Sequence, residues 1–244
     1  LHTAYRRQRQ MCIRDRNGDD NHNVTMTVPV KYNYGSFLMG DGTTKLVPTT
    51  ELGFLDGDMF IISCQYDQSQ VTANSTSIPV TLLSTPLCID PKNNEGLTQT
   101  KAEPTNPLYS LDKQQSSLVY YDKNTIVLTM PYWVKVTNSS VEDSELKKHS
   151  FVLSYDPTTM KDTDTKLKLY ISHVVDDAGE TVTRSNFTYA YRAYSIRDAL
   201  TVFKEKTGKL PKYLELTAKT NSSKDELKEE SGETSVEYDY AFTE

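Results

Sequence analysis

Alternating apolar and polar side chains near the start of the chain predict a β-strand. Apolar residues occupy every second position from Val24 to Val30, and polar residues such as Thr25 and Thr27 stand between them. This period of two places the apolar side chains on one face of an extended segment. The pattern therefore indicates a strand with one buried and one exposed face.

Further short strands follow at close spacing. Apolar residues flank Gly40-Asp41-Gly42, which is typical of a tight hairpin turn because glycine accepts positive φ angles. The same tripeptide occurs in phosphate and calcium loops, but the helix or additional carboxylates of those sites do not follow. Residues 59–66 form a nearly continuous apolar run, and residues 78–83 supply another strand. This series predicts a small closed, OB-like barrel over residues 24–90.

The composition changes after this barrel. Residues 91–116 are poor in apolar side chains and contain Pro91, Pro104 and Pro107, so we expect them to form a linker. A second series of strands follows, with alternation over 167–173 and again over 187–193. The sequence DDAGE at 176–180 predicts a hairpin turn between these two runs.

One short helix interrupts the second series. Ser195 and Asp198 have the spacing of a capping box, and Gly208 is a suitable helix stop. Between them lies an apolar stripe at helical spacing: Ile196, Ala199, Leu200 and Phe203. Strands resume afterwards, which predicts an antiparallel β-sandwich over residues 117–244. The predicted fold class is all-β: an N-terminal OB-like barrel followed by a C-terminal antiparallel β-sandwich with one short helix.

The charge is distributed unevenly. The 244 residues carry a formal net charge of −6, but residues 1–16 contain five arginines and one aspartate. Within them, AYRRQRQMCIRDR resembles a translated sequencing-adapter oligonucleotide, so we interpret this leader as an artefact and set it aside. The rest has 22 basic and 32 acidic residues, a net charge of −10. This balance argues against a nucleic-acid partner, which requires a basic surface.

The order of these features resembles that of the NigD-like proteins of Bacteroidetes. The resemblance covers residues 17–244 and rests on these stretches: FLMGDGTTKLVP at 37–48, GDMFIISCQYD at 57–67, LYISHVVDDAGETVTRSNFTYAYRAYSI at 169–196, PKYLELTAKTNSS at 211–223 and VEYDYAF at 236–242. Members of this family are cell-envelope lipoproteins with an N-terminal OB domain and a C-terminal β-sandwich. The resemblance implies a location in the periplasm or at the outer-membrane surface, with membrane association only through a lipid anchor.

The same resemblance bears on the start of the chain. The acidic NGDDNHN at 17–23 resembles the tether that such lipoproteins carry after a lipidated cysteine, so we expect residues 1–23 to be a disordered leader and tether. The family name comes from a bacteriocin operon, which implies an immunity role. No catalytic residue is transferred, because the family has none established.

Candidate chemistry is sparse. His173 lies near Asp176 and Asp177 in the sequence, but a strand residue and a turn pair are not expected to converge into a metal or acid–base site. Cys64 and Cys88 stand in strand-like surroundings typical of packed thiols. We therefore expect no enzyme activity, no cofactor and no metal site. An uncharacterised hydrolase using Cys64 or His173 remains an alternative.

Aromatic residues are the candidate ligand-binding groups. The chain has 16 tyrosines, and a flat ring can lie against the apolar face of a sugar, although most aromatic residues of β proteins pack in the core. The candidate binding residues are Tyr120, Tyr121, Tyr132 and Trp133. The leading hypothesis is thus a non-enzymatic envelope lipoprotein that binds a protein or glycan partner. The alternative is a carbohydrate-binding module of a glycan-uptake system.

Overall fold

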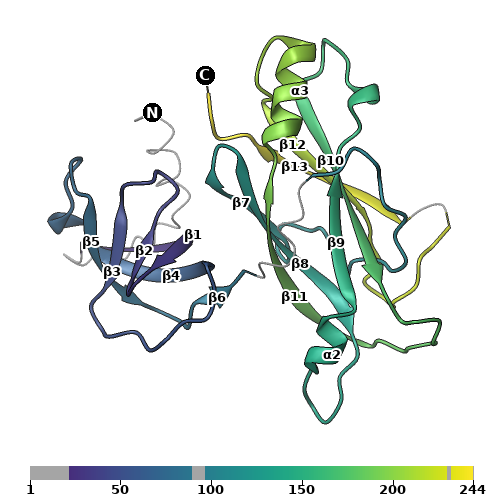
Figure 1. Ribbon diagram of the computed structural model, residues 1–244, viewed down its shortest axis with the longest axis horizontal. Coiled ribbons are helices and arrows are strands. Elements are labelled where there is room, and N and C mark those ends of the chain that lie inside the picture. The colour runs from purple at the N-terminus through teal and green to yellow at the C-terminus, as the bar shows by residue number, and fades with distance from the viewer. Residues whose placement is uncertain (1–21, 90–96, 230–231, 244) are drawn as a thin grey trace. The chain divides into compact units, whose positions relative to one another are not determined.

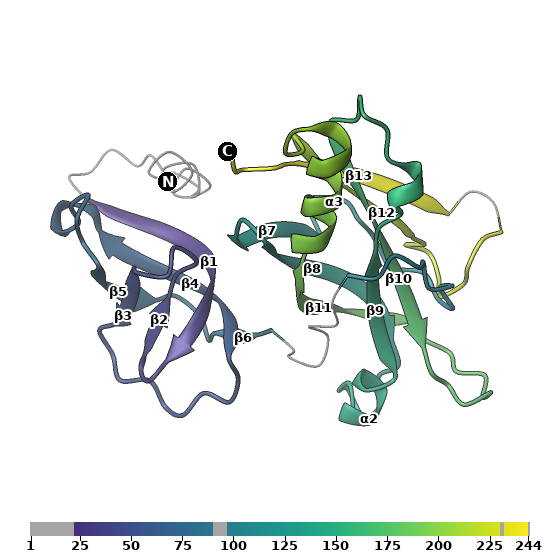
Figure 2. The ribbon, with the colours of Figure 1, turned by 45° about the horizontal axis from the view of Figure 1, so that its top comes forward.

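Two compact units make up the computed structural model, which describes residues 22–89, 97–229 and 232–243 (Figures 1 and 2). Unit 1 comprises the residues up to 89 together with 119–123 and 241–243, and unit 2 comprises the other described residues. The leader and most of the acidic stretch lie outside the described residues. Within the described ranges, no helix is long and apolar enough to cross a membrane.

Unit 1 is a closed five-stranded barrel with one additional short strand. Its elements are β1 (Asn23–Asn33), β2 (Ser36–Leu38), β3 (Lys45–Pro48), β4 (Met59–Asp67), η1 (Gln68–Gln70), β5 (Ser77–Leu82) and β6 (Leu87–Cys88). The strand order is β1-β2-β3-β5-β4, and β4 also pairs with β1, which closes the ring. Closure removes the free edges of the five strands. The predicted barrel is confirmed.

The barrel core follows from the predicted alternation. Val30 on β1 is completely buried, and it packs in one cluster with Phe37, Leu46 and Ile62 from the next strands. The Gly-Asp-Gly sequence forms the predicted turn between β2 and β3, with Gly42 at a φ of 74°. The Asp41 carboxylate accepts hydrogen bonds from the backbone N–H groups of residues 43 and 44, so it stabilises this turn.

Unit 2 contains two β-sheets. Its elements are β7 (Ser117–Asp122), whose residues from 119 onward are grouped with unit 1, β8 (Thr125–Val134), α2 (Asp143–Leu146), β9 (His149–Ser154), η3 (Pro157–Thr159), β10 (Lys166–Val175), β11 (Asn186–Ser195), α3 (Arg197–Thr207), β12 (Tyr213–Lys219) and β13 (Glu233–Asp239). One sheet has the order β13-β12-β10-β9 and the other the order β11-β8-β7 (Figure 1). The Tyr194 hydroxyl of β11 donates a hydrogen bond of 2.7 Å to the Phe151 carbonyl of β9, which joins the inner faces of the sheets. Two packed sheets confirm the predicted sandwich.

The sandwich departs from the prediction in one strand pair. β10 and β12 run parallel, whereas the sequence predicted an antiparallel arrangement throughout. The chain passes from β10 through β11 in the other sheet and then through α3 before it returns as β12. A crossover through a helix brings a strand back in the same direction, which explains the parallel pair.

The predicted helix is present as α3. Its stripe Ala199, Leu200 and Phe203 is buried, and Gly208 ends the helix with a φ of 76°. The predicted start is wrong by a short distance, because Ser195 is the last residue of β11 and Ile196 occupies the N-cap position without a side-chain hydrogen bond.

The DDAGE segment does not form a hairpin. β10 pairs with β9 and β12, whereas β11 pairs with β8, so residues 176–185 connect the two sheets. Glu180 N–H donates to the Asp177 carbonyl, and Ala178 and Gly179 have positive φ angles, so a local turn exists. The turn chemistry was predicted correctly, and the pairing of the flanking strands was not.

The range expected to be a linker contributes residues to the core of unit 2. Leu108 is completely buried and Leu111 nearly so. Leu108 forms bridges with Tyr132 of β8 and with Thr220 after β12, and Thr98 forms a bridge with Ser154 of β9. These backbone hydrogen bonds hold much of residues 97–116 against both sheets, and a few apolar side chains are enough to anchor the segment.

Candidate functional site

The four aromatic residues proposed as ligand-binding groups are all buried. The exposed fractions are 4% for Tyr120, 6% for Tyr121, 2% for Tyr132 and 6% for Trp133. Neighbouring side chains on a strand point to opposite faces, so both faces of these strands are covered. All four rings are thus buried in this structure, and their role in ligand binding stays a prediction.

The surroundings of two of these rings explain their burial. The Tyr132 ring packs edge-on against His149, Phe151 and His173, with centroid distances of 4.8, 5.0 and 5.7 Å. Trp133 Nε1 donates a hydrogen bond of 2.8 Å to the Asn221 carbonyl, and its ring lies 5.1 Å from that of Tyr109. The first ring fills the space between the sheets, and the loop segments beside β8 cover the second.

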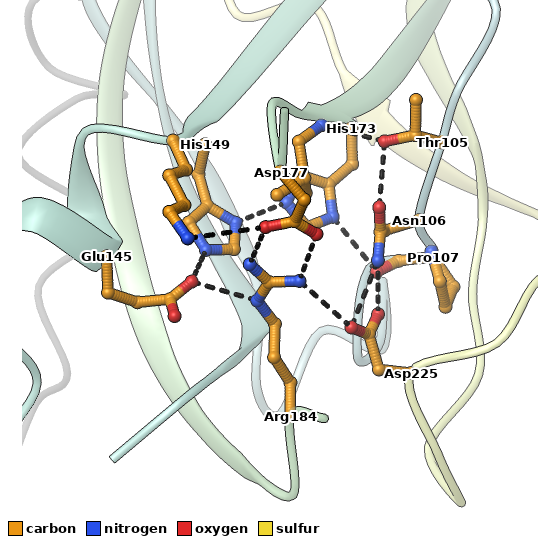
Figure 3. A network of polar contacts seen from close by, with 11 residues as sticks. Thr105, Asn106, Pro107, Glu145, His149, His173, Asp177, Arg184 and Asp225 are labelled. Atoms are coloured by element: carbon orange, nitrogen blue, oxygen red, sulfur yellow. Dashed lines mark hydrogen bonds and ion pairs between the residues drawn. The ribbon is translucent and has the colours of Figure 1, made fainter. Parts of the chain in front are cut away.

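The two histidines that pack against Tyr132 belong to a network of charged and polar side chains, most of them buried. Figure 3 shows this network. It is assembled from α2, β9, β10, the loop between β10 and β11, the loop after β12 and the segment before β7. Its main members are Thr105, Asn106, Glu145, His149, His173, Asp177, Arg184 and Asp225. Because these residues come from six separate segments, the network joins the loops at one end of the sandwich to its strands.

A chain of three close contacts runs through the two histidines. Glu145 Oε1 lies 2.7 Å from His149 Nε2, His149 Nδ1 lies 2.9 Å from His173 Nε2, and His173 Nδ1 lies 3.0 Å from the Pro107 carbonyl oxygen. The Glu145 carboxylate can only accept, so we assign the donating N–H of His149 to Nε2. The Pro107 carbonyl can also only accept, so a neutral His173 donates its single N–H either from Nδ1 to Pro107 or from Nε2 to His149 Nδ1, and the other contact is then not a hydrogen bond. All four imidazole nitrogens therefore face protein partners.

Arg184 is the central cation of the network. Its Nε donates to Glu145 Oε1 at 2.8 Å, and its two terminal nitrogens donate to the Asp177 carboxylate at 2.9 and 2.7 Å (Figure 3). Asp225 Oδ2 lies 3.9 Å from Nη1 on another side. The planar guanidinium group thus bridges three carboxylates, and its side chain is only 1% exposed.

Asp225 and Asn106 extend the network toward the strand β10. Asn106 Nδ2 donates to both carboxylate oxygens of Asp225 at 3.0 Å, and Thr105 Oγ1 donates to Asn106 Oδ1. Thr105 Oγ1 also accepts the backbone N–H of Val175 at 2.7 Å. The charged loop after β12 therefore places one carboxylate, that of Asp225, in the interior.

Burial and pairing act in opposite directions on the titratable groups. Burial lowers the pKa of His173 to about 3, aided by the charge of His149 and opposed by the Pro107 carbonyl. Burial also lowers the pKa of His149, although Glu145 opposes this effect. The hydrogen bond from Arg184 lowers the pKa of Asp177. At neutral pH the two imidazoles are neutral, whereas Asp177 and Arg184 are charged.

Burial acts differently on the two remaining carboxylic acids. It favours a raised pKa for Glu145, but hydrogen bonds from His149 and Arg184 overcome it, so the pKa of Glu145 is lowered. Burial raises the pKa of Asp225, and the hydrogen bond from Asn106 only partly offsets it. Close pairing with a cation therefore decides which carboxylic acid ionises most readily.

The network has few means of performing chemistry. A general base or a metal ligand needs an imidazole nitrogen that can face a substrate or an ion, and here each one already faces a protein atom. In the part of the chain that the structure describes, no three His, Cys, Asp or Glu side chains are arranged to hold a metal ion. The contacts of the network link loops to strands, which is the arrangement of a structural, stabilising cluster.

The sequence analysis did not predict this convergence. His173 and Asp177 belong to one network after all, although they are linked through His149, Glu145 and Arg184 and do not touch each other. The only local signal is the i, i+4 spacing of Glu145 and His149, which is typical of a pair on one helix face, although α2 ends at Leu146 and His149 is the first residue of β9. Asp176 stays at the turn, where its carboxylate accepts the Ala178 N–H.

The remaining candidates do not form an additional site. Cys64 is completely buried in the core cluster of the barrel, whereas Cys88 is exposed. Cys64 belongs to unit 1 and His173 to unit 2. The placement of each residue within its own unit therefore gives no support to a Cys–His pair.

An open groove lies beside the network in unit 2. It is formed by residues 109–113, 220–223 and 234–236 together with Lys228, and its volume is about 660 Å³. This size falls within the roughly 300–1,000 Å³ of small-molecule pockets. The groove is therefore a concave surface of unit 2 large enough for a small ligand.

Comparisons with known proteins relate the chain to structures from two bacterial genera. No protein-family model and no curated protein matches the sequence. A Bacteroides fragilis structure described as a "putative lipoprotein" is 29% identical, with a TM-score of 0.67, over 88% of this chain and 98% of that one. An uncharacterised protein from Parabacteroides merdae is 15% identical over the same shares, with a TM-score of 0.51, and shows likeness of fold alone.

Proposed function

We propose that this protein is a cell-envelope lipoprotein of the NigD-like type that binds a protein or glycan partner and catalyses no reaction. The observation that carries the proposal is the similarity to the B. fragilis protein, which extends over both units. The description of that protein as a lipoprotein supports a lipid anchor at the membrane. The periplasm and the outer-membrane surface are both compatible with such an anchor.

The structure of unit 2 supports a binding role over catalysis. The ionisable groups of its buried network bind one another. Arg184 pairs with Glu145 and Asp177, and each histidine faces a protein partner. Catalytic groups, by contrast, need a polar atom that is available to contact the substrate. The groove is lined by hydroxyl, amide and ammonium groups, which are suited to holding a polar ligand.

Metabolic labelling tests the lipoprotein assignment. The complete gene, with its natural upstream codons, is expressed in a Bacteroides host supplied with an alkyne-tagged fatty acid. We expect the tag on the mature protein and its loss when the first cysteine after the signal segment is replaced by serine. An unlabelled protein in the soluble fraction would overturn the assignment. A screen of hydrolase substrates then tests the non-enzymatic part, which activity lost on His173→Gln would contradict.

A glycan partner is favoured within this proposal by the groove, not by the four buried rings. The polar lining and the open shape match a ligand with many hydroxyl groups. The alternative of a carbohydrate-binding module in a glycan-uptake system uses the same surface.

A further inference from the structure

The groove of unit 2 has walls that are fixed before any ligand arrives. Leu108 N–H donates to the Lys219 carbonyl, and Asn221 N–H donates to the Leu108 carbonyl, both at 2.9 Å. Trp133 of β8 donates a hydrogen bond from Nε1 to the Asn221 carbonyl. These bonds join the segment that begins at residue 109 to the one that begins at residue 220, so both walls are preorganised.

The Asn221 side chain stiffens the wall further. Its amide nitrogen donates to the Glu226 carbonyl, and its amide oxygen accepts the Ser223 N–H, both at 2.9 Å. Asn221 itself is 6% exposed. The loop after β12 therefore presents its exposed residues from a fixed backbone.

Hydroxyl groups dominate the lining of the groove. Those of Thr220 and Thr234 bond to each other at 3.0 Å, but those of Ser222 and Ser223 form no hydrogen bond within the described part of the chain. Both of these serine residues are exposed. A hydroxyl both donates and accepts, so this pair can exchange hydrogen bonds with a polyhydroxylated ligand.

An aromatic side chain, that of Tyr109, also lines the groove. The Tyr109 ring stacks on Phe187 with a centroid distance of 4.3 Å and an interplanar angle of 26°. Trp133 packs against it at 5.1 Å. A half-buried ring that is held from two sides offers apolar contact area at little cost in side-chain entropy.

The charges of the lining favour an anion. Lys113 and Lys228 line the groove, and neither ammonium group forms an ion pair within the described residues; Lys113 Nζ lies 4.7 Å from the centre of the Tyr238 ring. Asp112 is the single carboxylate of the lining, and its Oδ1 accepts the Gln114 N–H. The groove is thus locally cationic in a chain whose net charge is −6.

We propose that this groove binds a saccharide that carries a carboxylate, such as a uronic-acid oligosaccharide. The hydroxyl groups of Ser222 and Ser223 contact the sugar hydroxyls, Tyr109 contacts an apolar ring face, and Lys113 and Lys228 pair with the carboxylate. The inference rests on the proposed binding function and names the chemistry of its partner. A neutral sugar would leave both ammonium groups unpaired, which gives the preference for an acidic one.

Titration with defined trisaccharides tests the proposal. Trigalacturonate is added to the ¹⁵N-labelled full chain at low ionic strength, and maltotriose serves as the neutral probe. We expect the backbone signals of residues 109–113 and 220–223 to shift with trigalacturonate and to shift less with maltotriose. The double variant Lys113→Gln/Lys228→Gln should bind trigalacturonate about tenfold more weakly, since it removes both ammonium groups that pair with the carboxylates.

Matched variants separate binding from folding. Lys168→Gln removes an exposed lysine of β10 that does not line the groove, so it should leave the affinity unchanged. Ser222→Ala/Ser223→Ala keeps the backbone bonds and should weaken binding of both trisaccharides. No shift with either probe, equal affinity for both, or an unaltered affinity after loss of the two lysines would each overturn the proposal. The lipid-labelling result is independent of these outcomes, so the two proposals can fail separately.

Discussion

His149 Nδ1 and His173 Nε2 lie 2.9 Å apart in the interior of the sandwich, with ring centroids 5.1 Å apart and ring planes inclined by only 18°. Two charged imidazoles at this distance would repel each other, and neither is in contact with bulk water. Burial accordingly lowers the pKa of both rings below that of a free histidine. The contribution of this pair to the free energy of unfolding therefore depends on pH.

The stability of unit 2 is expected to fall on mild acidification. In the unfolded chain each imidazole binds a proton below a pKa of about 6.5, whereas the folded pair resists protonation, His173 down to a pKa of about 3. The unfolded state then binds more protons, so the free energy of unfolding decreases as the pH falls below about 6.5. The slope is up to about 1.4 kcal/mol per pH unit for each ring. Urea unfolding from pH 7.5 to pH 5 measures it.

Histidine variants identify the source of this slope. His173→Gln should flatten the dependence of the unfolding free energy on pH, whatever it does to the stability at pH 7.5. His22→Gln removes an exposed imidazole of unit 1 and serves as the control, for which the slope should persist. An equal slope in the wild type and His173→Gln would show that the pair does not titrate as argued.

Arg184 should be the most costly single loss in the network. Arg184→Met leaves the buried Glu145 without its cation and Asp177 with Lys148 alone, 3.6 Å away, and breaking a buried pair in this way costs roughly 3–5 kcal/mol of unfolding free energy. Adding Asp177→Asn and Glu145→Gln should recover part of the loss, because it removes the unpaired charges. Urea unfolding at pH 7.5 measures both variants.

A surface ion pair provides the comparison. Lys224 and Glu226 are paired, but their side chains are 65% and 60% exposed. Lys224→Met is expected to leave the unfolding midpoint nearly unchanged, because water already screens the pair. If Arg184→Met lowered the free energy of unfolding no more than Lys224→Met does, the network would not stabilise unit 2 as its geometry indicates.

The sequence was informative about elements and much less so about their partners. The alternation of apolar and polar residues correctly predicted the barrel strand at Val24–Val30, and Gly208 correctly predicted the end of α3. Both signals depend only on a few neighbouring residues. The segment from 176 to 180 had the residues of a turn, but nothing local states whether the flanking strands pair with each other. The hairpin prediction failed at this step.

Burial of the polar site was equally hidden from sequence patterns. Glu145, Arg184 and Asp225 are charged, and charged side chains are usually exposed. Their side chains are buried here because each meets a partner far along the chain. The burial of Tyr132 and Trp133 was hidden in the same way: Phe151 of the facing sheet packs against the first ring, and Asn221 and Tyr109 contact the second. A period-two pattern cannot indicate which exposed face will later be covered by a loop.

Substitution of the buried aromatic residues should therefore reduce stability. Tyr132→Ala opens a cavity among the rings of His149, Phe151 and His173 and should lower the unfolding free energy by about 3–5 kcal/mol. Tyr34→Ala is the control, because Tyr34 is 99% exposed and the change should leave the midpoint in place. A Tyr132→Ala protein as stable as the wild type would instead support a ligand-facing ring.

Gly208 allows the backbone cost of the end of α3 to be measured separately. Its φ is 76°, and a Cβ added there would meet no atom within 4 Å, so Gly208→Ala tests conformation without a steric clash. We expect a loss of about 1–2 kcal/mol of unfolding free energy, the usual cost of a left-handed alanine. Gly53→Ala, equally open but without a positive φ, should be neutral. Equal melting temperatures for the two variants would contradict this account.

The two described cysteines should differ sharply in reactivity. Cys88 is exposed and Cys64 is completely buried in the barrel core, so a thiol reagent reaches the first in the native protein and the second only when the barrel opens. In a Cys12→Ser background, Ellman's reagent should titrate one thiol rapidly and the other only in denaturant. Cys88→Ser should abolish the rapid phase alone. Rapid reaction of both thiols would reveal an accessible Cys64, and with it a reason to reconsider a cysteine nucleophile.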